Sequence, residues 1–94
     1  MAEGAEVTNN EARNRFELVV DGATAVAQYT LDEGVIHLTH TVVPLEVEGR
    51  GIGSRLVKGA LDDARRRGLK VDPVCPFVRA YIERHPEYED LLAA

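Results

Sequence analysis

The first half of the chain alternates apolar and polar residues, as β-strands with one buried face do. The alternating runs cover residues 16–20, 25–31 and 35–43, and residues 7–9 are a shorter candidate strand. Asp21-Gly22 and Asp32-Glu33-Gly34, both turn signals, separate the three longer runs. Because these connections are short, we predict that the three longer strands form an antiparallel meander.

The periodicity becomes helical after residue 51. Apolar side chains fall on one face of a helix that starts at Gly51 or Ile52, namely Ile52, Leu56, Val57, Ala60, Leu61 and Ala64. Arg65-Arg66-Arg67 complements the helix dipole near its C-terminal end, and Gly68 is a natural residue to terminate it. The basic cluster is therefore explained by the helix without a ligand.

The C-terminal third begins with a short apolar alternation over residues 69–75, which predicts a strand. A helix joins it to the preceding strand, so we expect the two to be parallel with a right-handed crossover. Pro73 cannot donate a ladder hydrogen bond and marks an edge or a point where the strands diverge. Pro76 opens a second helix, and residues 86–92 form a last helical turn or two. The predicted fold class is α+β, a twisted mixed sheet with packed helices.

Length and composition describe a single domain over residues 1–94, with residues 1–6 as a flexible tail. An apolar content of 45% and a charged content of 29% are typical of soluble globular proteins. The sequence shows no apolar run long enough to span a membrane and no signal peptide. A single cysteine cannot form an internal disulfide, which predicts a reducing, cytoplasmic location. The net charge of −5 argues against nucleic acid as a partner and is compatible with a cationic amine.

Three alternate glycines, Gly49, Gly51 and Gly53, stand where the third long strand passes into the helix. Backbone amides can approach a ligand closely at glycine, and a helix N-terminus adds unpaired N–H groups and a positive dipole end. Such a turn attracts an anion, usually a phosphate. Arg50 and Arg55 lie near the helix start and are candidates for phosphate contacts. The alternative is a tight strand–helix connection without a ligand.

The glycine spacing restricts the kind of phosphate ligand. A P-loop requires Lys-Ser or Lys-Thr after the glycines, and neither is present. A Rossmann fingerprint is matched by Gly49 and Gly51, but Ser54 takes the place of its third glycine. Asp72 lies near the distance of a ribose-binding acid, but only one strand–helix–strand unit follows the first strands. Acyl-coenzyme A is the third candidate.

The segments around these glycines resemble a known family. Val43-Pro44, Gly49-Arg50-Gly51-Ile52-Gly53 and Leu56-Val57 resemble the [RQ]-x-x-G-x-[GA] pyrophosphate loop of the GNAT superfamily of acyl-CoA N-acyltransferases. The resemblance extends to the minimal GNAT-like acetyltransferases through three further segments, His40-Thr41, Pro73-Val74-Cys75-Pro76-Phe77 and His85-Pro86-Glu87-Tyr88. Glu48 departs from the motif, whose first position is usually Arg or Gln. A carboxylate there is unfavourable beside a pyrophosphate unless it points away.

The resemblance implies a truncated GNAT fold in which the fourth and fifth strands splay apart to admit the pantetheine arm. It also implies an N-acetyltransferase that uses acetyl-CoA and an amine acceptor such as a protein lysine. The implied coenzyme A site comprises Thr41, Val42, Val43, Gly49, Arg50, Gly51, Ile52, Gly53, Ser54 and Arg55. Two alternatives stay open: a non-catalytic CoA or acyl-CoA sensor, and an interaction module that has lost the ligand.

Three residues are candidates for the chemistry. Cys75 precedes a helix, where the dipole favours the thiolate, although a lone cysteine is most often a small buried residue. His40 shares its alternation phase with Ile36 and Leu38, so we expect it on the buried side, as a catalytic base or as a hydrogen-bonded core residue. The resemblance also implies Tyr81 as a candidate acid toward the CoA thiolate, with core packing as the alternative. The three histidines and the cysteine lack metal-ligand spacing.

Overall fold

The computed structural model describes residues 7–93. Its elements are β1 (Thr8–Asn10), η1 (Glu11–Arg13), β2 (Arg15–Val20), β3 (Ala23–Asp32), β4 (Val35–Val42), η2 (Leu45–Val47), α1 (Ile52–Arg66), β5 (Lys70–Pro73), α2 (Pro76–Arg84) and η3 (Pro86–Leu91). The tail predicted for residues 1–6 lies outside the described part of the chain. No helix within residues 7–93 is long and apolar enough to span a membrane.

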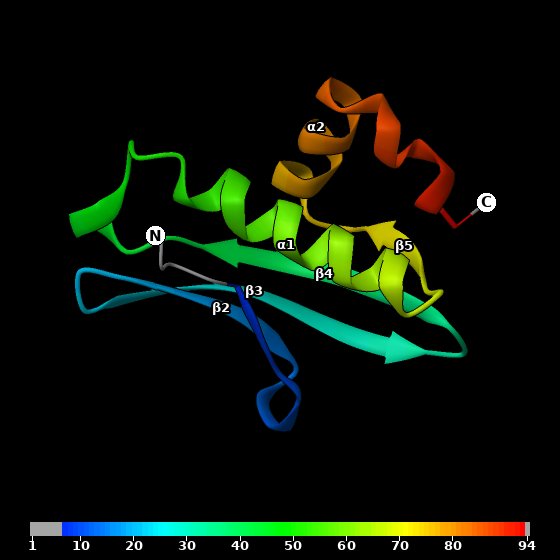
Figure 1. Cartoon of the computed structure of the whole chain (residues 1–94), viewed down its shortest axis with the longest axis horizontal. Coiled ribbons are helices and arrows are strands. Elements are labelled where there is room, and N and C mark those ends of the chain that lie inside the picture. Colours follow the sequence, from blue (N-terminus) through cyan, green and yellow to red (C-terminus); the bar gives the residue numbers. More distant parts are fainter. Residues whose placement is uncertain (1–6, 94) are drawn as a thin grey trace.

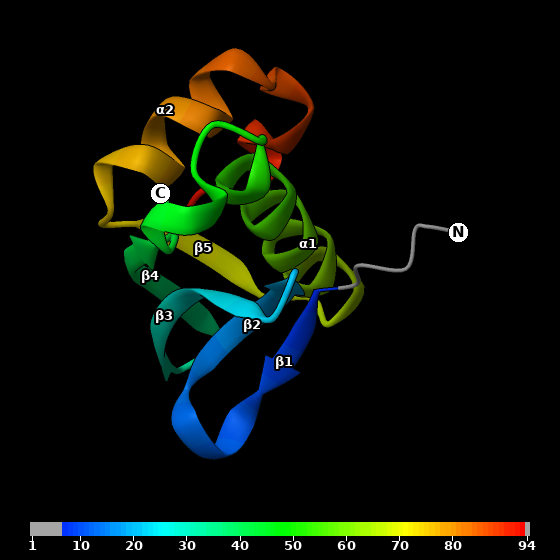
Figure 2. The same ribbon diagram turned by 90° about the vertical axis from the view of Figure 1, so that its left-hand side faces the viewer.

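The five strands form one sheet in sequence order, β1-β2-β3-β4-β5. Pairs from β1 to β4 are antiparallel, and β4 pairs with β5 in parallel through α1. Both long helices pack on the same face of the twisted sheet, as Figures 1 and 2 show. The opposite face is covered by no element of residues 7–93. These features confirm the α+β mixed sheet predicted from the sequence.

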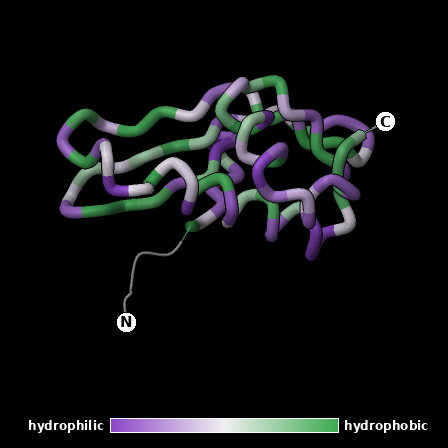
Figure 3. Tube along the Cα trace, turned by 90° about the horizontal axis from the view of Figure 1, so that it is seen from above, coloured by the Kyte–Doolittle hydropathy of each residue, from purple (hydrophilic) through white to green (hydrophobic). Residues whose placement is uncertain are grey.

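The core lies between the covered face of the sheet and α1. Alternate strand residues enter it, so hydrophobic and hydrophilic positions interchange along the trace in Figure 3. The sheet contributes Phe16, Leu18, Ala25, Ala27, Tyr29, Ile36, Leu38 and Val71. The helix contributes Ile52, Leu56, Val57, Ala60, Leu61 and Ala64, the six residues that its periodicity predicts. Burial of this apolar surface is the main term that stabilises the fold.

A β-bulge interrupts the pairing of β3 with β4. Gln28 is paired with His40, but the next residue of β3, Tyr29, is paired with Leu38. The extra residue on β4 is Thr39, and it reverses the alternation of β4 beyond that point. The prediction that His40 faces the buried side is therefore wrong: His40 is exposed on the uncovered face of the sheet.

The pairing of β4 with β5 ends before β4 does. The last parallel pair joins Leu38 to Pro73, whereas β4 continues to Val42. The Cys75 amide still donates to the carbonyl of Leu38 at 2.9 Å, and the chain then turns into α2. Beyond Leu38, no strand of residues 7–93 pairs with the edge of β4 that faces away from β3. The divergence predicted at Pro73 is thus confirmed.

Candidate functional site

The glycine loop between β4 and α1 borders a cavity of about 350 Å³. The residues that line it are Val43, Glu48, Gly49, Gly51, Ile52, Gly53, Ser54 and Phe77. Gly51 is the N-cap of α1 with φ 72°, a left-handed conformation that costs glycine little, and it supplies no side-chain cap. The first-turn amides of α1, which have no partner inside the helix, therefore remain available to a ligand. Predicted site residues from two segments of the chain, Val43 and the glycine loop, meet here.

Phe77 was not predicted to line this cavity. The sequence places it on the packed face of α2, but the buried residues of that helix are Val78, Tyr81 and Ile82. The Phe77 ring is 40% exposed and packs over the glycine loop, where a Cβ on Gly53 would stand 3.0 Å from it. The third glycine of the loop is thus needed for contact with α2. Helical periodicity identifies the residues of α2 that pack on the core, and it cannot identify a residue such as Phe77 that contacts a neighbouring loop instead.

The charged residues of the loop region do not all point toward the cavity. Glu48 lines it, whereas Arg50 donates to the carboxylate of Asp21 at 2.7 Å. Arg55 lines a different cavity, on another side of α1. The structure therefore brings Val43 and several residues of the glycine loop to one cavity, while phosphate binding there and contacts from Arg50 and Arg55 stay predictions.

Cys75 lies where β4 and β5 diverge, at the N-cap of α2, and is only 7% exposed. Its Sγ is 3.6 Å from the Oγ1 of Thr41, which the bulge has turned toward the helices. Burial opposes ionisation of the thiol. Hydrogen bonds from the Thr41 hydroxyl and from the backbone amides of Val78, Phe77 and Thr41 outweigh it and hold the pKa of Cys75 below its ordinary value. The thiol therefore ionises more readily than that of an ordinary cysteine.

The other two predicted catalytic residues are not beside Cys75. His40 is on the opposite face of the sheet, so the expected Cys–His pair is absent among the described residues. Tyr81 is buried and stacks on His85, with ring centroids 4.0 Å apart, and burial raises its pKa. It is not among the residues that line the cavity. Catalytic roles for these two residues stay predictions.

A second histidine forms a contact that sequence reasoning missed. His37 and Asp72 are a cross-strand pair of β4 and β5, and Nδ1 of the ring lies 2.8 Å from Oδ2 of the carboxylate. His37 has the opposite alternation phase from Ile36 and Leu38 and lies on the uncovered face. Asp72 is 35 residues away from His37 in the sequence, so only the register of β4 against β5 identifies it as the partner of His37.

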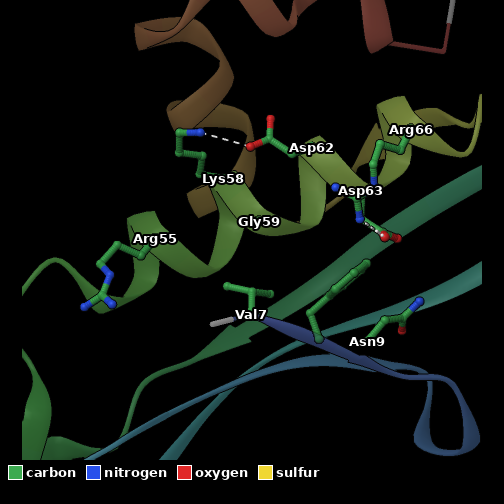
Figure 4. A pocket seen from close by; sticks show the side chains of 9 residues that line it. Val7, Asn9, Arg55, Lys58, Gly59, Asp62, Asp63 and Arg66 are labelled. Atoms are coloured by element: carbon green, nitrogen blue, oxygen red, sulfur yellow. Dashed lines mark hydrogen bonds and ion pairs between the residues drawn. The ribbon is translucent and has the colours of Figure 1, made fainter. Parts of the chain in front are cut away.

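A second cavity, of about 380 Å³, lies between α1 and β1 (Figure 4). Its charged side chains are engaged with each other, since Lys58 donates to Asp62 at 2.9 Å and Arg66 to Asp63 at 2.6 Å. It shares no lining residue with the glycine-loop cavity. Although slightly larger, this cavity lies along the side of α1 rather than at its N-terminus, and its described lining includes neither cysteine nor histidine. Residues 7–93 also contain no group of three or more His, Cys, Asp or Glu placed to hold a metal ion.

Comparison with known proteins identifies relatives of this chain and a structure with the same fold. Protein NATD1 from Gallus gallus is 31% identical over 84 residues, which are 86% of this chain and 76% of that protein. Protein NATD1 from Homo sapiens is 31% identical over 83 residues, 85% of this chain and 74% of the relative. The NMR structure of a GCN5-like protein from Staphylococcus aureus superposes with a TM-score of 0.73 at 30% identity, covering 96% of this chain and 89% of the other.

The family model of the GCN5-related N-acetyltransferases matches residues 15–91. The match includes β2 to η3, and therefore the glycine loop, Cys75 and the diverging strands. The chain belongs to the GCN5-related N-acetyltransferase family.

Proposed function

We propose that this protein transfers an acetyl group from acetyl-CoA to an amine, with a protein lysine as the acceptor class. The observation that carries the proposal is the continuity of three features: the glycine-loop cavity, the unpartnered edge of β4 and the thiol of Cys75. Thr41, near the end of β4, lies two residues before Val43, which follows the strand, and Cys75 lies two residues before Phe77, where α2 begins. In each of these two segments, a residue that lines the cavity (Val43 or Phe77) is therefore close in sequence to a residue of the Thr41–Cys75 contact.

The residues present fit acetyl-CoA as a substrate. Amides of residues 49–54 would hold the pyrophosphate, because the N-terminus of α1 is uncapped and glycine leaves the backbone open. Backbone groups of Thr41 to Val43 would bind the pantetheine arm, since that edge of β4 has no strand partner. A cavity of about 350 Å³ is within the usual range of small-molecule sites. The thioester would then lie beside Cys75.

Two chemical routes lead to the product. We favour direct attack by the amine on the thioester, with the carbonyl oxygen stabilised by a backbone N–H near Val43. In the other route the Cys75 thiolate takes the acetyl group first and passes it to the amine. Transfer of an acetyl group from one thiol to another gains little energy, so the second route is useful only to an acceptor that cannot reach the CoA sulfur.

Glu48 favours a second candidate function. A carboxylate that lines the cavity repels a pyrophosphate, as expected of a domain that senses CoA weakly or only binds partners. Calorimetry with CoA separates these possibilities, because no binding would exclude both the enzyme and the sensor. With binding established, consumption of acetyl-CoA in the presence of amine-bearing proteins distinguishes enzyme from sensor.

Mass spectrometry of the intact protein after incubation with acetyl-CoA separates the two routes. Direct attack predicts no adduct on Cys75, and Cys75→Ala should then retain much of its activity. An acetyl adduct that Cys75→Ala abolishes together with turnover would establish the two-step route instead.

A further inference from the structure

The proposed function leaves open where the amine enters and which group accepts its proton. The helix side of the site is occupied by Cys75, Thr41, Val43 and Phe77, which pack below α1 and α2. No element of residues 7–93 covers the opposite face of the sheet along β4 (Figure 1). A large acceptor such as a protein lysine can therefore reach the end of the β4–β5 pairing from the uncovered face.

His37 lies on that face, close to the point of divergence. Its pair with Asp72 is followed by a single further pair, Leu38 with Pro73, before the strands separate. The carbonyl of Leu38 accepts the amide of Cys75, so the residue next to His37 is bonded directly to the start of the thiol segment. His37 and Cys75 thus lie on opposite faces of the sheet, close to the point where β4 and β5 separate.

The contact with Asp72 prepares the ring of His37 for proton transfer. A carboxylate accepts hydrogen bonds, so in the neutral ring Nδ1 carries the hydrogen and Nε2 holds the lone pair. The bond of 2.8 Å also fixes the orientation of a ring that is 30% exposed, while the Asp72 side chain is 46% exposed. A histidine oriented by a carboxylate through Nδ1 is the arrangement in which Nε2 acts as a general base.

We propose that His37, oriented by Asp72, is the base that accepts the proton of the acceptor amine, and that the amine enters from the uncovered face of the sheet. The amine nitrogen forms a bond to the acetyl carbon, and the carbon–sulfur bond breaks. The electron pair leaves on the CoA sulfur, and the proton of the nitrogen passes to Nε2 of His37. Asp72 is a positioning residue, since it acts only through the ring.

His40 provides a matched control on the same face. It lies three residues further along β4, beyond the bulge, and is paired with Gln28 on β3. Within residues 7–93 no carboxylate hydrogen bond orients it. If exposure of a histidine on this face were sufficient, the two histidines would contribute equally to turnover.

The test measures acetylation of poly-L-lysine and of N-α-acetyl-lysine from acetyl-CoA, together with CoA affinity by calorimetry. His37→Ala should lower kcat by about 10²–10⁴-fold with unchanged CoA affinity, and added imidazole should restore part of the rate. Asp72→Asn should lower kcat by less, and His40→Ala should lower it far less than His37→Ala does. Rescue by imidazole would not follow from a purely structural role.

The inference rests on the proposed function, and the outcomes separate the two. A folded His37→Ala protein with full turnover, or with lost turnover that imidazole does not restore, would overturn the role of His37 alone. A loss in His40→Ala equal to that in His37→Ala would also overturn it. If the original protein binds CoA but acetylates neither amine, the acetyltransferase proposal is refuted, and the inference about His37 with it.

Discussion

Replacement of Gly51 by alanine tests the glycine loop most directly. Gly51 adopts φ 72°, and apart from its chain neighbours no heavy atom of residues 7–93 lies within 4 Å of the position that a new Cβ would take. The change therefore causes no clash, and its effect on folding is the cost of a left-handed non-glycine residue, about 1–2 kcal/mol. For a domain of this size, 1 kcal/mol corresponds to a fall in Tm of about 4–8 °C. We expect a folded but measurably less stable protein.

Gly34→Ala is the matched control. Gly34 has φ 83° in the turn between β3 and β4, again with no atom within 4 Å of its Cβ position. Both variants should lose similar stability, but only Gly51 lines the cavity. A methyl group there keeps a phosphate from the first-turn amides, and loss of one charge-assisted hydrogen bond costs about 1.5–3 kcal/mol. We thus expect calorimetry to show CoA binding at least about tenfold weaker in Gly51→Ala and unchanged in Gly34→Ala.

The comparison has a clear contrary outcome. If both variants lose the same stability and Gly51→Ala still binds CoA as tightly as the original protein, the pyrophosphate does not lie against the N-terminus of α1. Equal weakening in both variants would instead assign the loss of affinity to general destabilisation, and the argument from cavity geometry would fail.

Three further changes test the electrostatics. Glu48→Gln should tighten CoA binding by about 0.5–1 kcal/mol in calorimetry, because it removes a negative charge from the cavity wall; weaker binding would contradict the assigned site. Thr41→Val should raise the pKa of Cys75, so the pH profile of alkylation by iodoacetamide should move to higher pH; an unchanged profile would exclude the hydroxyl as a cause of the lowered pKa. Burial and the hydrogen bond to Asp62 raise the pKa of Tyr88 to about 12, so the contribution of Tyr88 to stability should be complete below pH 10 and lost toward pH 12. Asp62→Asn should shift the phenolate absorbance of Tyr88 to lower pH in a spectrophotometric titration, and no shift would contradict this account.

Local chemistry explains why most of the fold was predictable. The hairpin at Asp21-Gly22 forms with both residues at positive φ, 51° and 79°, as that dipeptide predicts. Gly68, with φ 70°, terminates α1, where the amide of Leu69 bonds back to Ala64 at 2.9 Å. Each of these outcomes depends on residues within one or two turns of the chain, and such information is present in a single sequence.

The features that could not be predicted depend on pairing between distant segments. The bulge at Thr39 arises because β4 has one residue more than β3 at this point. The pattern of residue types in the β4 sequence gives no indication of it. Arg50 lies near a predicted phosphate site, but its side chain is drawn to Asp21, 29 positions away. The direction of a long side chain at the surface is decided by such partners, and no local rule identifies them.

The bulge and Pro73 together create the candidate site. If β4 alternated without interruption, Thr41 would lie with His37 on the uncovered face, and its hydroxyl would be absent from the environment of Cys75. If β5 continued beyond Pro73, its backbone would pair with the edge of β4 that we assign to the pantetheine arm. One irregularity supplies a hydrogen bond to the sulfur, and the other leaves backbone groups unpaired beside it. Both would be defects in a purely structural sheet. Their coincidence at one thiol, next to an uncapped helix terminus, is the strongest structural argument that this sheet binds a ligand.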